Sequence, residues 1–246
     1  MDPEKSVSDR ESNFASQTAA RIGAPAAFAL AALAAVGFTI GVLTPPHSGP
    51  WCTGDCISYP YADAARFFPR DYWWMVPGIL LAPLFMVVAA CVHYCAPGGA
   101  RPFSLLGVCF AAIATPLVSV AYFMQLVIAQ PGLERHEFVA IFTMYNPHGL
   151  FTALEQMGFL MLAAAFFFVS RAIPRESLAA VIGCWVMSTA ALIVIVAFVG
   201  MAVGYGPEMG TPFEAAIITV DWIALVVAGI AVGLWLREVS AHTARP

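Results

Sequence analysis

Long apolar runs separated by short polar connections dominate the pattern of residues along the chain. Six of these runs approach or exceed the roughly 20 residues that a helix needs to cross the hydrocarbon core of a bilayer. The strands of transmembrane barrels alternate apolar and polar residues, so these continuous runs predict helices. The predicted spans are 23–43, 75–96, 105–130, 150–170, 178–202 and 215–236. We therefore expect an all-α membrane protein with a single bundle of six transmembrane helices.

Composition agrees with a membrane protein. Hydrophobic residues make up 61% of the chain and charged residues 11%, whereas soluble domains carry about 25% charged residues. The six spans use over half of the 246 residues and leave no room for a second domain. We predict a flexible cytoplasmic leader at 1–20, the membrane domain at 21–238 and a cytoplasmic tail at 239–246. The net charge of −4 argues against a nucleic-acid partner.

The distribution of basic residues predicts the orientation, because cytoplasmic connections carry an excess of Lys and Arg. Three basic residues fall on the side of the long connection after the first span, and eight fall on the side of both termini: Lys5, Arg10, Arg21, Arg101, Arg171, Arg175, Arg237 and Arg245. Both termini are therefore expected in the cytoplasm of a bacterial cell, with a multi-pass protein in its inner membrane and a long outer loop between the first two helices. A signal peptide is the alternative for the first run, but the mixture of acidic and basic residues before it and the length of the run favour a true helix.

Two carboxylic acids interrupt apolar spans, Glu155 in the fourth and Asp221 in the sixth. An ionisable residue at that depth costs roughly 2.5–3.5 kcal/mol on insertion scales, so it is expected to face the bundle interior with a partner or a task. At 1.5 Å per residue, both acids lie about 8–12 Å inside the outer ends of their helices. Gln125 and Tyr122 of the third span lie at a similar level, which predicts one polar pocket.

Helical phase and aromatic content extend this predicted site. His148 and Glu155 share a helix face through the spacing His148, Thr152, Glu155. We assign Asp221 and Glu155 as catalytic residues, and the following residues as substrate-binding: Tyr122, Gln125, His148, Phe151, Phe159 and Trp222. A magnesium-binding DDxxD motif, a glycine-rich phosphate loop and a tight metal-ligand spacing are all missing from the sequence. We expect neither a metal nor a cofactor.

Two buried carboxyl groups beside aromatic rings suit one kind of chemistry. A carboxylic acid in apolar surroundings stays protonated and acts as a Brønsted acid, and aromatic faces stabilise a developing cation. Protonation of an isoprenoid alkene or epoxide, followed by a carbocation cascade, fits this combination. Two alternatives remain open: the acids fix the bundle through hydrogen bonds, or they serve proton-coupled transport or lipid binding. Transport predicts a polar path to the cytoplasm, and the inner halves of the fourth and sixth spans offer few polar residues.

Cys52 and Cys56 form a close pair, WCTGDC, in the predicted outer loop. An oxidising exterior permits a disulfide between them. A reduced pair and half of a metal site are the alternatives, and the second cysteine pair that a zinc site needs does not follow in the sequence.

Three segments carry a resemblance: WWMVPGILLAPLFMVVAACVHYCA, YNPHGLFTALEQMGFLMLAAAF and AAIITVDWIALVVAGI. Over about residues 45–235 the chain resembles small bacterial six-helix integral membrane proteins, and YNPHGLFTALE is the most specific piece. Its size and acid placement are also similar to the membrane-bound terpene cyclases of drimentine-type indole-sesquiterpenoid pathways. Fungal meroterpenoid cyclases share the two-acid logic, but their acids fall at different places along the sequence.

This resemblance implies a function. It implies a metal-independent cyclase, started by protonation, that acts on a lipid-soluble prenylated substrate such as a prenyl-indole, with the two acids at Glu155 and Asp221. We take this cyclase as the leading prediction, with the lipid bilayer and a hydrophobic prenylated molecule as partners. The alternative is a proton-coupled small-molecule transporter or lipid-binding membrane protein that uses the same acids.

Overall fold

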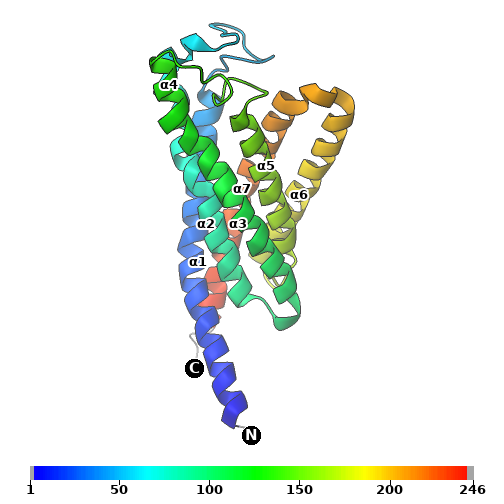
Figure 1. Ribbon diagram of the computed structural model, residues 1–246. Coiled ribbons are helices and arrows are strands. Elements are labelled where there is room, and N and C mark those ends of the chain that lie inside the picture. Colours follow the sequence, from blue (N-terminus) through cyan, green and yellow to red (C-terminus); the bar gives the residue numbers. More distant parts are fainter. Residues whose placement is uncertain (1–2, 243–246) are drawn as a thin grey trace.

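The computed structural model describes residues 3–242, with the side chains of residues 13–241. The described residues form helices, turns and loops, without a β-strand (Figure 1). Six long helices make up the bundle: α1 (Pro3–Leu43), α2 (Met75–Cys95), α3 (Arg101–Met124), α5 (Leu150–Ser170), α6 (Leu178–Tyr205) and α7 (Gly210–His242). Five stretches are long and apolar enough to cross a membrane, and the last of them, Leu178–Ala241, contains both α6 and α7. The predicted all-helical membrane class is confirmed.

Short helical segments connect the long helices. They are η1 (Ala62–Phe67), η2 (Arg70–Tyr72), η3 (Gly98–Ala100), η4 (Gln125–Ala129), α4 (Gln130–Glu134) and η5 (Gly206–Met209). The π-helical η4 follows α3 directly and leads into α4, so the third membrane helix continues without interruption to Glu134. Single π-turns of this kind widen a helix locally and often occur near functional sites.

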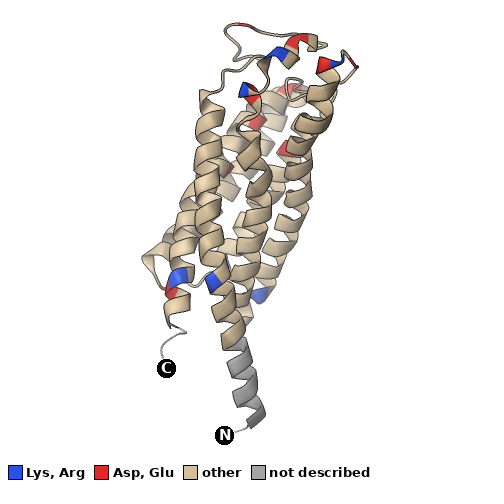
Figure 2. Ribbon diagram, turned by 90° about the vertical axis from the view of Figure 1, so that its left-hand side faces the viewer, with Lys and Arg blue, Asp and Glu red and all other residues tan. Residues whose placement is uncertain are grey.

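The two ends of the bundle differ. One end carries the connections 44–74 and 135–149 together with α4, and we call it the cap end; the opposite end, where both chain termini lie, we call the terminal end (Figure 1). Charged residues gather at these two ends and are sparse along the helices between them (Figure 2). The assignment of the terminal end to the cytoplasm stays a prediction.

Small residues set the spacing between α1 and α7. Near the terminal end a Cβ added at Gly229 would lie 2.9 Å from the Ala27 carbonyl oxygen, so the two backbones are in contact there. A Cβ at Gly233 would likewise meet the ring of Phe28. Such small residues allow close helix approach in membranes. Toward the cap end, α6 and the first part of α7 diverge from the other helices (Figure 1).

Helix boundaries differ from the predicted spans mainly at the polar ends of the chain. α1 begins at Pro3, so most of the predicted flexible leader belongs to the first helix. α7 runs from Gly210 to His242, and it absorbs the first part of the predicted tail. Residues 1–2 of the predicted leader and 243–246 of the predicted tail lie outside the described residues.

Candidate functional site

A cavity of about 360 Å³ opens at the cap end between α1 and α7. The loop that follows α1 forms its roof, and Trp74, the residue before α2, and Phe151 of α5 contribute to its inner wall. The wall is largely aromatic and aliphatic, with a few polar groups. The residues that form its walls and roof include Gly37, Phe38, Val42, His47, Trp51, Asp71, Trp74, Tyr145, Phe151, Glu214, Ala215, Thr219 and Trp222.

Aromatic rings in edge-to-face contact form the deep part of the cavity. Trp222 is 1% exposed, and its ring centroid lies 6.4 Å from that of Trp74. Trp74 in turn meets Tyr122 edge to face at 5.2 Å. Two glycines make room for these rings, because a Cβ at Gly37 would overlap Trp222, and one at Gly78 would lie 2.7 Å from Tyr122. The glycines of α1 and α2 therefore fix where the large rings lie.

A pair of carboxyl groups lies beside this aromatic cluster. Glu155 of α5 is fully buried, whereas Glu214 of α7 is partly exposed and lines the cavity. Glu214 and the Tyr122 hydroxyl are the groups that act electrostatically on the Glu155 carboxyl. Both carboxyl oxygens of Glu155 and the Tyr122 hydroxyl nevertheless lack a hydrogen-bond partner. The cluster is thus a close but unsatisfied group of polar atoms at the cavity wall.

Asp221 stands apart from this pair. It is 0% exposed and neither of its carboxyl oxygens has a hydrogen-bond partner. Its electrostatic environment is set by burial alone, without a contribution from another ionisable group among the described residues. Asp221 lies seven residues beyond Glu214, or about 10 Å deeper along α7. The carboxyl that the structure places beside Glu155 is therefore Glu214.

The other predicted site residues divide into two groups. Phe151 lines the cavity, and Phe159 packs against Trp222 with centroids 6.5 Å apart. Gln125 and His148 do not line the cavity. Gln125 is buried and uses both ends of its amide on the backbone of the connection before α5, donating to Phe142 and accepting from the Met144 N–H at 2.9 Å. His148 lies on the surface, where its Nε2 is 3.5 Å from a carboxyl oxygen of Glu208.

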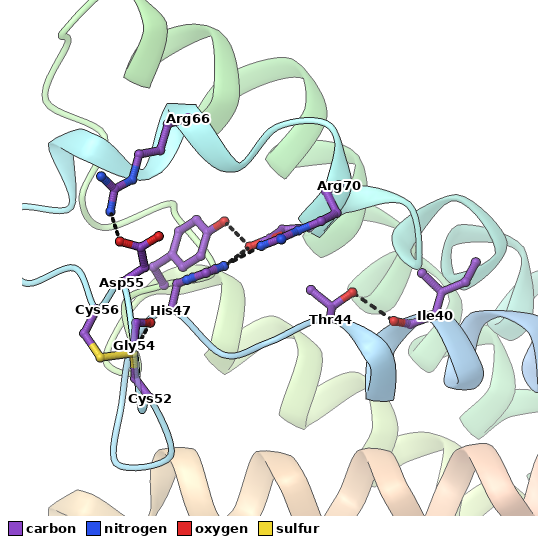
Figure 3. Close-up of polar contacts among 11 residues, drawn as sticks. Ile40, Thr44, His47, Cys52, Gly54, Asp55, Cys56, Arg66 and Arg70 are labelled. Atoms are coloured by element: carbon purple, nitrogen blue, oxygen red, sulfur yellow. Dashed lines mark hydrogen bonds and ion pairs between the residues drawn. A yellow bond between two sulfur atoms is a disulfide. The ribbon is translucent and has the colours of Figure 1, made fainter.

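The roof contains a buried polar network (Figure 3). Asp71, 1% exposed, accepts hydrogen bonds from the Tyr145 hydroxyl and from Arg70 Nε, each at 3.1 Å. His47 Nε2 lies 2.7 Å from the Arg70 guanidinium and 3.5 Å from Asp71. A guanidinium can only donate, so at the shorter contact Nε2 accepts and the ring hydrogen sits on Nδ1. Nδ1 is buried and has no hydrogen-bond partner.

The Tyr145 side chain connects this roof to the inner wall through its hydrogen bond to Asp71. Burial raises the pKa of its hydroxyl above the ordinary value, and the neighbouring Tyr72 and the Asp71 carboxylate raise it further. The hydroxyl therefore remains a donor to Asp71 throughout the physiological pH range. This bond ties the connection before α5 to the one before α2.

The roof loop is closed on itself. The structure joins Cys52 and Cys56 in a disulfide, and Asp55 lies 3.5 Å from Arg66 (Figure 3). The Ile57 N–H donates to the His47 carbonyl oxygen at 2.8 Å, which returns the loop to its starting point. The exposed ion pair contributes little, so the disulfide and the backbone bond are the main constraints on the roof.

Sequence reasoning assigned no role in the site to several of its residues, chiefly Glu214, His47, Asp71, Trp74 and Tyr145. Glu214 shares a helix face with Asp221 through its seven-residue spacing, and that was the available signal. The roof residues come from a connection whose path depends on turns and tertiary contacts. Among the described residues, no group of three His, Cys, Asp or Glu side chains is arranged to hold a metal ion.

Comparisons with family models, with curated proteins and with solved structures give no significant match to this chain.

Proposed function

We propose that this protein is a membrane-bound cyclase that protonates a lipid-soluble prenylated molecule, such as a prenyl-indole, in the cavity between α1 and α7. The observation that carries the proposal is the carboxyl pair Glu155–Glu214, one member of which lines an aromatic cavity. Two adjacent carboxyls in apolar surroundings share a proton, because two negative charges repel strongly there. Glu214 is the member within reach of a ligand.

The proposed reaction conserves atoms and electrons. The Glu214 carboxyl gives its proton to one carbon of an alkene, whose π electrons form the new C–H bond and leave a tertiary carbocation. A second alkene of the same molecule attacks the cationic carbon with its π electrons and closes a ring, which moves the positive charge to the far carbon of that alkene. The carboxylate pair then takes a proton from a C–H bond beside this carbon, and the electrons of that bond form a new C=C bond. The product has the mass of the substrate. Trp74 and Trp222 face the cation that forms, and indole rings stabilise cations best among aromatic side chains.

The position of the cavity suits a substrate dissolved in the bilayer. Its border includes Val42, which is 68% exposed, and the exposed residues Ala215 and Thr219 on the facing side of α7. These residues lie on the outward surfaces of two predicted spans, so an apolar molecule reaches the cavity sideways from the lipid. A volume of about 360 Å³ lies in the range of small-molecule sites.

The alternative is a lipid-binding protein or proton-coupled transporter that uses the same acids. The open side of the cavity favours binding without chemistry, because it requires no closed reaction chamber. Transport is disfavoured by the interior of α7 toward the terminal end, where its described buried residues after Trp222 are apolar: Ala224, Leu225, Ala228, Ala231, Val232, Trp235 and Leu236. The described part of α7 therefore offers no polar path beyond Asp221.

Turnover by the purified protein in lipid nanodiscs tests the proposal. A panel of neutral prenylated compounds, farnesyl-indole first, is incubated with the protein and analysed by chromatography with mass detection. A new peak of unchanged mass is expected. Glu214→Gln should lower the rate at least about 100-fold, since a positioned general acid contributes 10²–10⁴-fold, and Glu155→Gln should lower it as well. Asp221→Asn is the matched control within α7 and should keep the activity.

Three results would contradict parts of this account. Full activity in Glu214→Gln with loss in Asp221→Asn would move the proton donor to Asp221. No conversion by folded wild-type protein, together with quenching of tryptophan fluorescence by the same compounds, would establish binding without cyclisation. Neither conversion nor quenching would remove prenylated compounds as ligands of this cavity.

A further inference from the structure

A second cavity lies at the terminal end, far along the bundle from the first. It is a groove of about 470 Å³ between α1 and α7, and its apolar floor includes Ala24, Pro25 and Phe28. Arg21 of α1 and Arg237 of α7 stand at its border. The aromatic cavity and the carboxyl pair take no part in it, so it is independent of the proposed function.

The charge of the groove is strongly one-sided. Two arginines line it, and none of the described residues that line it carries a carboxylate. Both arginine residues are exposed, and the ion pairs found among the described residues leave both of them out. A guanidinium presents several N–H donors in a planar fork that matches phosphate oxygens. The groove is therefore complementary to a phosphate-bearing ligand.

The position of the groove along the bundle restricts the class of ligand further. The apolar run of α1 begins at Ile22, directly after Arg21, and that of α7 ends at Leu236, directly before Arg237. Both arginines thus lie where predicted spans end and the phospholipid headgroups begin. An apolar floor continues from them toward the bilayer interior through Ala24 and Phe28. An apolar floor gives no favourable contact to a free phosphate ion, whereas it does to an acyl chain.

We propose that this groove binds an anionic phospholipid, with its headgroup phosphate between Arg21 and Arg237 and one acyl chain along Ala24 and Phe28. Basic pockets between transmembrane helices select anionic lipids in this manner. Such a lipid bridges the first and last helices of the bundle at the end where their backbones are in contact. It is thereby expected to hold α1 and α7 together below the aromatic cavity.

Native mass spectrometry of the full chain in detergent tests this site, with phosphatidylglycerol and phosphatidylcholine of identical acyl chains as probes. Wild type should retain phosphatidylglycerol in preference to phosphatidylcholine. Each substitution, Arg21→Gln or Arg237→Gln, should weaken phosphatidylglycerol binding about fivefold and the double variant about 25-fold, since one basic residue near an anionic surface contributes roughly that much. Arg101→Gln, which removes a charge at the start of α3 at the same end, should leave binding unchanged.

One further double variant and one competitor make the outcomes decisive. Arg21→Lys with Arg237→Lys keeps the charge and should retain part of the preference, which guards against a double glutamine variant that folds poorly. An equal loss in Arg101→Gln would reduce the effect to general surface charge and overturn the site. Unchanged binding in both single variants would do the same. Displacement of the lipid by millimolar inorganic phosphate would show a free-anion site instead.

Discussion

Two buried aspartates with opposite surroundings allow a sharp test of the structure. Asp221 is 0% exposed with no hydrogen-bond partner for either carboxyl oxygen. A buried polar group left unpaired costs about 1–3 kcal/mol. Replacement by alanine removes that cost and opens a void of roughly methyl size, which costs about 1 kcal/mol. Asp221→Ala is therefore expected to raise the free energy of unfolding by about 1 kcal/mol.

Asp71 should respond in the opposite direction. It is 1% exposed and accepts hydrogen bonds from the Tyr145 hydroxyl and Arg70 Nε. The Arg70 side chain is 60% exposed, so its bond to the carboxylate is screened by solvent and contributes little. The bond from Tyr145 is buried, and hydrogen bonds to charged groups contribute about 1.5–3 kcal/mol. Asp71→Ala is therefore expected to lower the free energy of unfolding by about that amount.

Both changes are measured by unfolding the purified protein in mixed micelles of increasing SDS content, followed by far-ultraviolet circular dichroism. Each of the two variants serves as the control for the other, because each removes one buried carboxyl from the same bundle. If Asp221→Ala lowers the free energy of unfolding by more than about 1 kcal/mol, Asp221 has a hydrogen-bond partner in the membrane. That result would refute the prediction. Equal losses in both variants would show that any buried carboxyl stabilises this bundle.

Three further predictions concern the packing of the Trp222 ring, the connection before α5 and the titration of Tyr145. Gly37→Ala should displace the Trp222 ring, lower the free energy of unfolding by about 1–3 kcal/mol and shift tryptophan emission, whereas Gly200→Ala, which faces open space, should change neither. Gln125→Leu should cost about 1–3 kcal/mol in the same unfolding assay, because two backbone groups of the connection before α5 lose their partners. Tyr145→Phe should flatten the loss of stability at high pH: the folded hydroxyl keeps its proton above the unfolded pKa of 10.0, so its contribution is full below that pH and declines as pH rises. A titration curve of Tyr145→Phe identical to wild type above pH 10 would contradict this.

The apolar runs were sufficient to predict the helices, and most of their inner boundaries. The predicted ends at Leu43 and Ser170 coincide with those of α1 and α5, because a loss of apolar residues and a turn occur together there. The helix ends nearest the two chain termini, the start of α1 and the end of α7, were less predictable. Hydropathy marks where a helix leaves the hydrocarbon, and a helix continues beyond that point when its polar residues are compatible with helical backbone. α1 and α7 therefore extend well past their predicted spans.

The site was predictable only in part, for a geometric reason. Depth along a helix follows from counting residues, and it placed Tyr122, Phe151 and Trp222 near one level, where the structure has them in or beside one aromatic cluster. The rotation of α7 against α5 does not follow from counting. Glu214 and Asp221 share a face, and only the packing of the two helices decides which of them meets Glu155. Asp221 attracted the prediction because it interrupts the apolar span predicted at 215–236, whereas Glu214 precedes that span.

The arrangement of the cavity also constrains how a ligand lies in it on the proposed function. Its floor is aromatic, at Trp222 and Trp74, and the polar residues His47 and Asp71 line its roof. Glu214 lies on the wall as part of α7. On that proposal, we expect an amphiphilic substrate to place its polar group at the roof, because a polar group left against the aromatic floor would lack a hydrogen-bond partner. The prenyl chain would then extend toward the indole rings. Its alkenes would pass Glu214, and the cation formed next to this acid would face Trp222.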